Sequence, residues 1–286
     1  MILVTGANGH FGAATIDHLL QHVPVNNIVG LVRSEEKGAD LRRKGVTVRV
    51  GDYAEPASLN DAFRGVTKML LVSGTDLEHR AAQHRHVIDA AAAAGVEHIV
   101  YTSFYRHEDA GGVLGQLADG HVATEAHLEQ SGVPYTLLLN TLYAEVLPLF
   151  FGPAVLDQGI YLPAGDGAFS PAERDDMAEA AARILAGDGH AGQSYVIANT
   201  RNHTFSEIAG MIAEVSGKEV TYTAAETGQF RQVMQGAGVP DEAIGMTIAF
   251  SQAIAQGELR TPQSDLPALL GREPRSLRAF LERTYG

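Results

Sequence analysis

The chain has 286 residues, enough for two ordinary domains or for one large α/β domain with an added lobe, and its 45% hydrophobic and 19% charged residues exclude a disordered chain. A net charge of −13 disfavours binding to nucleic acid or to anionic lipid. Cysteine is absent, which excludes disulfides and thiolate metal sites, and we expect no metal. With no apolar run near the roughly 20 residues that span a bilayer, and no signal-peptide pattern at the N-terminus, we expect a cytoplasmic protein.

The first half of the chain alternates between short apolar runs and helical patterns. The apolar runs predict strands at Ile2–Thr5, Asn27–Val32, Thr47–Val50, Lys68–Val72, His98–Thr102 and Tyr135–Asn140. Helices are expected at Gly12–His22, Ser34–Lys44, Ser58–Phe63, Arg80–Ala94 and Gly120–Gln130. This repetition predicts an α/β fold with a Rossmann-type doubly wound parallel sheet, covered by helices on both faces.

The rhythm changes after about residue 145, where proline and glycine become frequent. Further elements are expected at Arg174–Leu185 (helix), Gln193–Ala198 (strand), Phe205–Val215 (helix), Glu219–Thr223 (strand) and 226–286 (helices). We therefore expect residues 1–145 to form a nucleotide-binding domain, with 193–198 as a candidate further strand of its sheet. Residues 146–286 are expected to form a smaller C-terminal α+β lobe that binds the substrate. The acidic residues in 173–179 are interpreted as a solvated helix start that suits the positive end of the helix dipole.

Three glycines lie between the first strand and the first helix, in I-L-V-T-G-A-N-G-H-F-G at residues 2–12. Gly6 permits a tight turn, Gly9 lets the backbone approach a pyrophosphate, and Gly12 lets the helix pack on the strand. The N-terminus of the helix then presents free N–H groups to the phosphates. A purely structural glycine turn is the alternative. We predict a dinucleotide-binding turn that comprises Gly6, Asn8, Gly9, His10, Phe11 and Gly12.

Residues that follow the next three strands complete the predicted cofactor site. Arg33 suits the 2′-phosphate of NADP, whereas an acidic residue there would suit NAD; a solvated arginine is the alternative. Asp52 and Tyr53 are expected at the adenine, unless Asp52 caps the following turn. Ser73 and Gly74 are expected beside the pyrophosphate and the nicotinamide ribose. The predicted cofactor is NADPH.

Several motifs together resemble the NmrA-like atypical short-chain dehydrogenases/reductases, and among them the bacterial members that reduce quinones and triphenylmethane dyes. The motifs are V-T-G-A-N-G-H-F-G at 4–12, V-R at 32–33, G-D-Y at 51–53, H-I-V-Y-T-S at 98–103, V-P-Y-T-L-L-L-N-T-L-Y at 133–143, S-G-K-E-V-T-Y at 216–222 and A-G-V-P at 237–240. The resemblance covers essentially the whole chain. It implies a Rossmann domain with a small C-terminal lobe, NADPH as donor, and Asn140 and Tyr143 in the nicotinamide pocket.

The Tyr-x-x-x-Lys pair of ordinary short-chain dehydrogenases is missing, since Leu117 and His121 occupy its two positions. Without a pair that protonates an alkoxide, we expect hydride transfer to a quinone or a similar delocalised acceptor rather than alcohol–ketone interconversion. The alternative is a non-catalytic NADP(H)-binding sensor that regulates a partner protein. A nucleotide-sugar epimerase with bound NAD is disfavoured by Arg33 and by the missing pair.

Polar side chains after the fifth and sixth strands are candidates for chemistry. His121, Ser103 and Tyr143 are the candidate catalytic residues, although each also has a purely structural interpretation, and Tyr101 is expected in the core. The candidate acceptor-binding residues are Phe104, Tyr105, Leu142 and Tyr143, in an apolar pocket bounded by 104–116 and 141–170 to which Leu114, Leu147, Phe150 and Phe151 contribute. His79, His84 and His86 are not expected to bind a metal. The expected partner is a small-molecule acceptor, and the expected assembly is a monomer or a homodimer.

Overall fold

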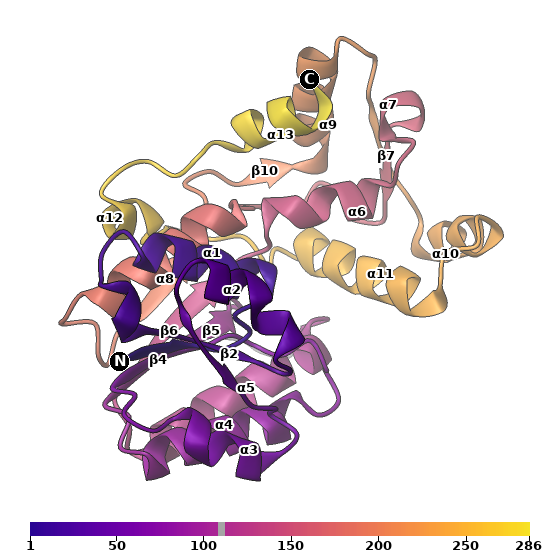
Figure 1. Cartoon of the computed structure of the whole chain (residues 1–286). Helices are drawn as coiled ribbons and strands as arrows, with labels where there is room; N and C mark the ends of the chain where they lie inside the picture. The colour runs from indigo at the N-terminus through magenta and orange to yellow at the C-terminus, as the bar shows by residue number, and fades with distance from the viewer. Residues whose placement is uncertain (108–111) are drawn as a thin grey trace.

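The central element of the structure, a computed structural model that describes residues 1–107 and 112–286, is a seven-stranded sheet (Figure 1). Its strands lie in the order β3 (Thr47–Val50), β2 (Ile28–Val32), β1 (Ile2–Val4), β4 (Lys68–Leu71), β5 (His98–Phe104), β6 (Tyr135–Asn140) and β9 (Ser194–Ile197). All neighbouring strands pair in parallel, which confirms the predicted doubly wound α/β sheet. The strand order reverses between β1 and β4, the place where such sheets bind ligands at the carboxyl ends of their strands.

Helices cover both faces of this sheet. One face carries α1 (His10–Leu19), α8 (Arg174–Ala186) and α12 (Leu266–Leu270), and the other carries α3 (Pro56–Ala62), α4 (Arg80–Ala93) and α5 (Gly115–Ser131). The strands between them are apolar because both of their faces are buried, and all five residues of β2 are buried.

Two predicted helices differ from the observed ones, and a glycine is involved in each case. The helix expected at 34–44 is a 3₁₀ turn (η2, Glu36–Gly38) followed by the short α2 (Ala39–Arg43), and a Cβ on Gly38 would lie 2.5 Å from Val48 Cγ1. The chain therefore passes too close to β3 there for any other residue. Gly120, the expected start of the fifth helix, lies inside α5, where its missing side chain makes room for Arg80.

A second lobe has its own apolar core. Its helices are η3 (Ala144–Val146), α6 (Leu147–Phe151), α7 (Val155–Gln158), α9 (Phe205–Ser216), α10 (Thr227–Gly236), α11 (Asp241–Ala255) and α13 (Leu277–Tyr285). Two short ribbons complete the lobe: β7 (Ile160–Leu162) pairs in parallel with β11 (Tyr222–Ala224), and β8 (Ala168–Phe169) pairs antiparallel with β10 (His203–Thr204). A further 3₁₀ turn, η1 (Val25–Asn27), precedes β2 in the first lobe. In Figure 1, α10 and α11 extend away from the body of the molecule.

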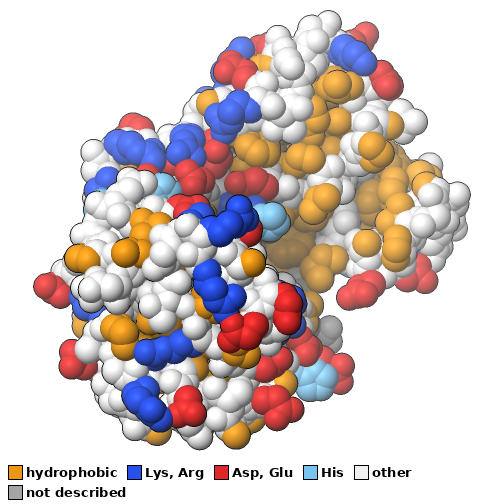
Figure 2. All heavy atoms as spheres, in the orientation of Figure 1, with side chains coloured by type: hydrophobic (Ala, Val, Ile, Leu, Met, Phe, Trp, Pro, Cys, Tyr) orange, Lys and Arg blue, Asp and Glu red, His pale blue; other side chains and the backbone are white. Residues whose placement is uncertain are grey.

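The two lobes do not correspond to two consecutive halves of the sequence. The elements α8, β9 and α12 all come after residue 146, yet α8 packs against α1 in the core of the first lobe, α12 packs against α8 and β9, and β9 pairs with β6. The segment considered as a returning strand, 193–198, therefore contains β9. Figure 2 shows a hollow between the lobes in which hydrophobic side chains gather.

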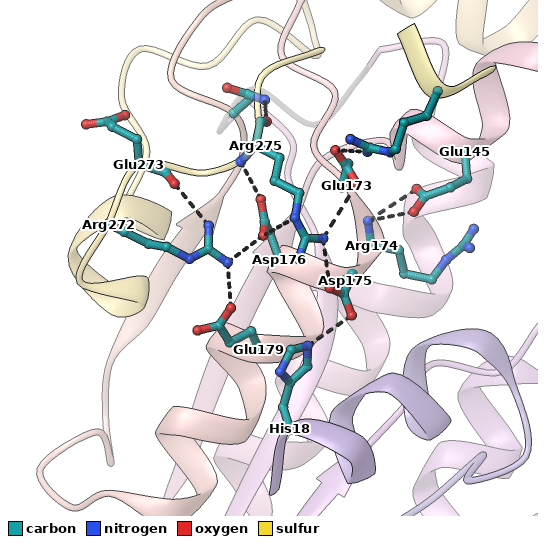
Figure 3. A network of polar contacts seen from close by, with 12 residues as sticks. His18, Glu145, Glu173, Arg174, Asp175, Asp176, Glu179, Arg272, Glu273 and Arg275 are labelled. Carbon is teal, nitrogen blue, oxygen red and sulfur yellow. Dashed lines mark hydrogen bonds and ion pairs between the residues drawn. The ribbon is translucent and has the colours of Figure 1, made fainter. Parts of the chain in front are cut away.

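The acidic residues at the start of α8 form an ion-pair network (Figure 3). Asp176 is fully buried, lies 2.8 Å from the Arg272 guanidinium and accepts the backbone N–H of Arg275 at 2.6 Å. Asp175 binds the Arg275 guanidinium at 2.7 Å and His18 of α1 at 2.9 Å. The prediction of a solvated helix start was wrong because a C-terminal segment about a hundred residues away in sequence covers these carboxylates. The network joins α8 to α1 and to the C-terminal segment.

Among the described residues, no helix is both long and apolar enough to cross a membrane.

Candidate functional site

A first cavity of about 320 Å³ lies at the carboxyl edge of the sheet, beside the reversal of the strand order. The loops that follow β1, β2, β3 and β4 enclose it. The predicted cofactor residues that line it are Gly6, Asn8, Gly9, Arg33, Asp52, Tyr53, Ser73 and Gly74. Residues from four separate parts of the sequence therefore meet in one cavity.

The glycines of the turn have distinct local roles. Gly6 has φ = +56°, in the left-handed region that favours glycine. A Cβ on Gly12 would lie 2.4 Å from the carbonyl oxygen of Gly6, so the helix can approach the turn only with glycine at this position. Gly9 has an ordinary φ of −82° and lines the first cavity at the N-terminus of α1. His10 is exposed and Phe11 is buried, and neither is among the residues that line the cavity.

Arg33 is exposed at the end of β2, on the wall of the first cavity. Nearby arginines are committed to carboxylates: Arg42 pairs with Glu35, and Arg43 pairs with Asp40. In the part of the chain that the structure describes, no carboxylate forms an ion pair with Arg33. Its guanidinium is available to an anion in the cavity.

Asp52 and Tyr53 follow β3. The Asp52 carboxylate accepts the N–H of Ala54 at 2.9 Å, which is the turn-capping role that the sequence analysis left as the alternative. The side chain nevertheless belongs to the cavity wall. The Tyr53 hydroxyl donates to the carbonyl of Val72 at 3.2 Å, and burial raises the pKa of this phenol.

The loop after β4 is held by side chains that the sequence analysis did not assign to the site. The N–H of Gly74 donates to His84 Nε2 at 2.9 Å, and Arg80 Nε donates to the Gly74 carbonyl at 2.9 Å. The N–H of Ser73 donates to Thr102 Oγ1 at 2.8 Å. The sequence feature that could have indicated this role is that Arg80 and His84 are four residues apart on one face of a predicted helix.

No group of three or more potential metal-binding side chains converges on one position among the described residues.

A second cavity of about 770 Å³ adjoins the first and shares Ser73, Thr75 and Asp76 with it. It lies between the lobes, where Figure 2 shows the hydrophobic hollow. Its other lining residues are Leu77, Glu78, Arg80, Ser103, Phe104, His121, Asn140, Thr141, Leu142, Tyr143, Val146, Leu149, Phe150, Glu242, Met246 and Phe250. The contribution of α11 was not foreseen, because its sequence resembles that of any amphipathic surface helix.

The predicted acceptor-binding residues divide into two groups. Phe104, Leu142 and Tyr143 line the second cavity, as does Phe150. Tyr105 does not, and its hydroxyl donates to the backbone carbonyl of Arg260 at 3.3 Å. Leu114 and Leu147 are buried in the core of the second lobe, and the ring of Phe151 packs on Phe205. Of the expected pocket boundary, residues 108–111 and the side chain of Gln116 lie outside the described residues. The side chain of Leu117, at the tyrosine position of the missing Tyr–Lys pair, also lies outside them.

Two of the three candidate catalytic side chains, Ser103 and Tyr143, contact charged neighbours. The buried Ser103 hydroxyl donates to the carboxylate of Glu125, which is ion-paired with Arg106. The guanidinium of Arg174 lies over the Tyr143 ring, 4.6 Å from its centroid. Burial raises the pKa of Tyr143 to about 12, although Arg174 and Asn140 oppose this rise, so this phenol stays protonated at neutral pH.

Asn140 lies at the end of β6, only 4% exposed, on the wall of the second cavity. Within the described residues, neither its amide nitrogen nor its amide oxygen makes a hydrogen bond of normal geometry, although the amide is close enough to the Tyr143 hydroxyl to oppose the rise of its pKa. A buried amide without partners costs free energy, and such groups are rare in folded proteins. Its position and its free donor and acceptor point to a ligand in the cavity.

His121, the third candidate, forms a pair with Tyr101. The hydroxyl of Tyr101 lies 2.7 Å from His121 Nδ1, and the ring of Phe104 stacks on the imidazole with 6.1 Å between centroids. Burial lowers the pKa of His121 to about 3, so the side chain is neutral at physiological pH. Tyr101 is fully buried, as predicted, but its contact with His121 was not foreseen.

Comparison with known proteins agrees with this geometry. The chain is 40% identical to quinone oxidoreductase 2 of Escherichia coli strain K12 over 272 residues, which cover 95% of this chain and 94% of that protein. It superposes on an NADPH complex of the E. coli NADPH-dependent quinone oxidoreductase with a TM-score of 0.93 and 38% identity, over the whole of both chains. It superposes equally completely on an NADP(H) complex of triphenylmethane reductase from Citrobacter sp., with a TM-score of 0.91 and 35% identity. The model of the NmrA-like family matches residues 1–273. The chain therefore belongs to the NmrA-like family.

Proposed function

We propose that this protein transfers hydride from NADPH to a quinone or a similar delocalised acceptor, such as a triphenylmethane dye, held in the second cavity. The observation that carries the proposal is that the two cavities meet at Ser73, Thr75 and Asp76. A donor in the first cavity and an acceptor in the second would then touch without any rearrangement of the lobes. The relatives at 35% identity or more are named as reductases of such acceptors, and the protein is an oxidoreductase.

The residues of the first cavity fit NADPH. The glycine turn leaves room for a pyrophosphate at the N-terminus of α1, and Arg33 offers an unpaired guanidinium to the 2′-phosphate. Asn140, on the wall of the adjoining second cavity, has an amide donor and acceptor that match the carboxamide of a nicotinamide reaching into that cavity. NADPH supplies the hydride when it is bound.

The residues of the second cavity provide an apolar surface that positions a flat acceptor. Phe104, Phe150 and Phe250 provide aromatic surface from both lobes. His121 stays neutral and Tyr143 stays protonated, so neither has the pKa near the working pH that efficient general acid–base catalysis requires. This favours acceptors whose reduced form is stabilised by its own delocalisation, and it disfavours simple ketones.

The second candidate function, a sensor that binds NADP(H) and regulates a protein partner, would use the same first cavity. The enzyme is favoured because an aromatic cavity of about 770 Å³ adjoins the cofactor site. The choice of acceptor, a cytoplasmic location and a monomeric or homodimeric assembly are parts of this proposal.

The test measures cofactor binding and turnover in parallel. We expect the protein to bind NADPH and to oxidise it, followed by absorbance, in the presence of at least one member of a panel of quinones and triphenylmethane dyes. Gly9→Val serves as the inactive control. Tight binding of NADPH without turnover on any acceptor would favour the sensor and contradict the enzyme.

A further inference from the structure

The hydrogen bond between Tyr101 and His121 lies directly behind the second cavity. Tyr101 is on β5 and fully buried, while His121 is on α5, 7% exposed, and lines the cavity. The phenol hydrogen needs an acceptor, because an unpaired hydroxyl in the interior costs about 1–3 kcal/mol. His121 Nδ1, at 2.7 Å, is the partner that the described residues provide.

Thr124, the other polar side chain near this phenol, is already committed. His84 Nε2 accepts the N–H of Gly74, so His84 carries its proton on Nδ1 and donates it to Thr124 Oγ1 at 2.9 Å. The Thr124 hydroxyl in turn donates to the Gly120 carbonyl at 2.6 Å. Thr124 Oγ1 retains one lone pair, but the hydrogen bond that the Tyr101 hydroxyl makes among the described residues is the one to His121 Nδ1 at 2.7 Å. With Tyr101 donating in that bond, the proton of the neutral imidazole is on Nε2.

We propose that Tyr101 holds His121 in the Nε2–H tautomer, so that His121 presents a single neutral hydrogen-bond donor to the oxygen of a carbonyl acceptor in the second cavity. Nε2 makes no hydrogen bond to any described residue, and the stacked ring of Phe104 fixes the plane of the imidazole. Under this proposal Tyr101 is a positioning residue and His121 contacts the acceptor.

Under this proposal His121 donates a hydrogen bond to the acceptor but does not transfer its proton. Burial, and then the positive charges of Arg80 and Arg106, disfavour an imidazolium at this position. Passing the Nε2 proton to the acceptor would require Tyr101 to give up its own proton in the interior, where burial raises the pKa of the phenol. The proton that completes a hydroquinone therefore comes from water, and His121 stabilises the oxyanion until then. The inference rests on the proposed function only in that the acceptor carries an oxygen.

The tautomer can be measured without cofactor or acceptor. In protein with ¹⁵N-labelled histidine, we expect the His121 nitrogens, assigned by their loss in His121→Gln, to show a protonated Nε2 and an unprotonated Nδ1 at pH 7. Tyr101→Phe should shift the population toward Nδ1–H. Tyr195→Phe is the matched control, since it removes a hydroxyl 2.9 Å from His190 Nδ1 at a place remote from the cavities. A wild-type His121 that is charged, or protonated on Nδ1, would overturn the proposal.

Kinetics provide the second test. His121→Ala should lower kcat with a quinone by about 10- to 100-fold, somewhat less than the loss of a typical oxyanion-hole donor because the quinone anion is delocalised. His121→Gln should retain most of the activity, because the glutamine amide supplies an N–H near the position of Nε2. Tyr101→Phe should lower kcat severalfold in the wild-type background and have no effect in His121→Gln. The Kd for NADPH should stay the same in all variants.

Two results would contradict this role. Equal effects of Tyr101→Phe in both backgrounds would show that the hydroxyl acts through the fold, and a parallel loss of NADPH binding would show that His121 contacts the cofactor instead. Failure of the proposed function would give a different result from failure of this inference. The wild type would then reduce no quinone, although NMR would still show His121 in the Nε2–H tautomer.

Discussion

Arg33 and the glycine turn carry the selectivity of the first cavity at the scale of single residues. Arg33 is exposed and, among the described residues, free of an ion pair, whereas Gly9 keeps the cavity open beside the N-terminus of α1. These two features act on different parts of the cofactor. Their substitutions therefore have separable effects.

Arg33→Ala should weaken NADPH binding by about 1.5–3 kcal/mol, roughly 10- to 150-fold, and leave NADH binding nearly unchanged, because the lost contact is a charge-assisted hydrogen bond to the 2′-phosphate. Titration with both cofactors measures this. Arg43→Ala, which removes an exposed arginine paired with Asp40, is the control. Equal losses for the two cofactors would show that Arg33 does not recognise the 2′-phosphate.

Gly9→Val should abolish binding of either dinucleotide and leave the protein folded, because Gly9 lines the cavity with an ordinary φ, and a Cβ there would lie 3.2 Å from the Gly6 carbonyl oxygen, a contact that a small shift relieves. Gly12→Val should instead destabilise the fold, since its Cβ would lie 2.4 Å from the Gly6 carbonyl oxygen. Circular dichroism and NADPH titration distinguish the two effects. Normal NADPH binding by Gly9→Val would rule out the phosphate-binding turn.

At the scale of elements, α4, β5 and α5 share a chain of buried polar groups. His84 links the loop after β4 to Thr124 on α5, and Tyr101 on β5 links to His121. Burial lowers the pKa of His84 and of His121 to about 3 each. Both histidines must therefore be neutral in the folded protein, which makes the stability of these packed elements sensitive to acid.

The free energy of unfolding should fall as the pH decreases below about 6.5. The unfolded chain binds protons at these histidines near their ordinary pKa of 6.5, whereas the folded protein resists protonation down to about pH 3. Each histidine accounts for a loss of about 2 kcal/mol between pH 7 and pH 5, since one pKa unit corresponds to about 1.4 kcal/mol. Urea unfolding at the two pH values measures this. His121→Gln should lose about 2 kcal/mol less than the wild type, and an identical loss would contradict the assignment.

At the scale of the whole molecule, the ion-pair network at the start of α8 ties the C-terminal segment to the nucleotide-binding lobe (Figure 3). The network stands beside the second cavity, because Arg174 in the first turn of α8 lies over the ring of Tyr143. The arrangement of the lobes and the shape of the cavity therefore depend on the same helix.

Asp176→Ala should lower the free energy of unfolding by about 1–3 kcal/mol, because the backbone N–H of Arg275 and an N–H of Arg272 lose their buried acceptor, although Asp175 and Glu179 still pair with the two guanidinium groups. Chemical denaturation measures the change. Asp188→Ala removes an almost fully exposed partner of Lys68 and should lower the stability far less, because water screens this ion pair. Equal costs for the two substitutions would show that burial of the network contributes nothing.

Chain order was enough to predict much of this protein. Apolar runs in 1–140 predicted the first six strands of the sheet, and parallel strands bring their carboxyl ends to one edge. The residues directly after those ends, from Gly6 to Gly74, therefore converge on the first cavity. These positions can be predicted from local sequence, because a residue that directly follows a strand of a parallel sheet lies at the carboxyl edge of that sheet.

Only the tertiary structure determined the rest. The contact of Tyr101 with His121, the lining of the second cavity by Met246 and Phe250, and the covering of Asp176 all join elements far apart in sequence. The sequence determined which segments become strands and helices, because periodicity and glycine positions act over a few residues. Which side chains face each other across those elements depends on how the second lobe and the C-terminal segment pack on the first lobe, and no local pattern contains that information.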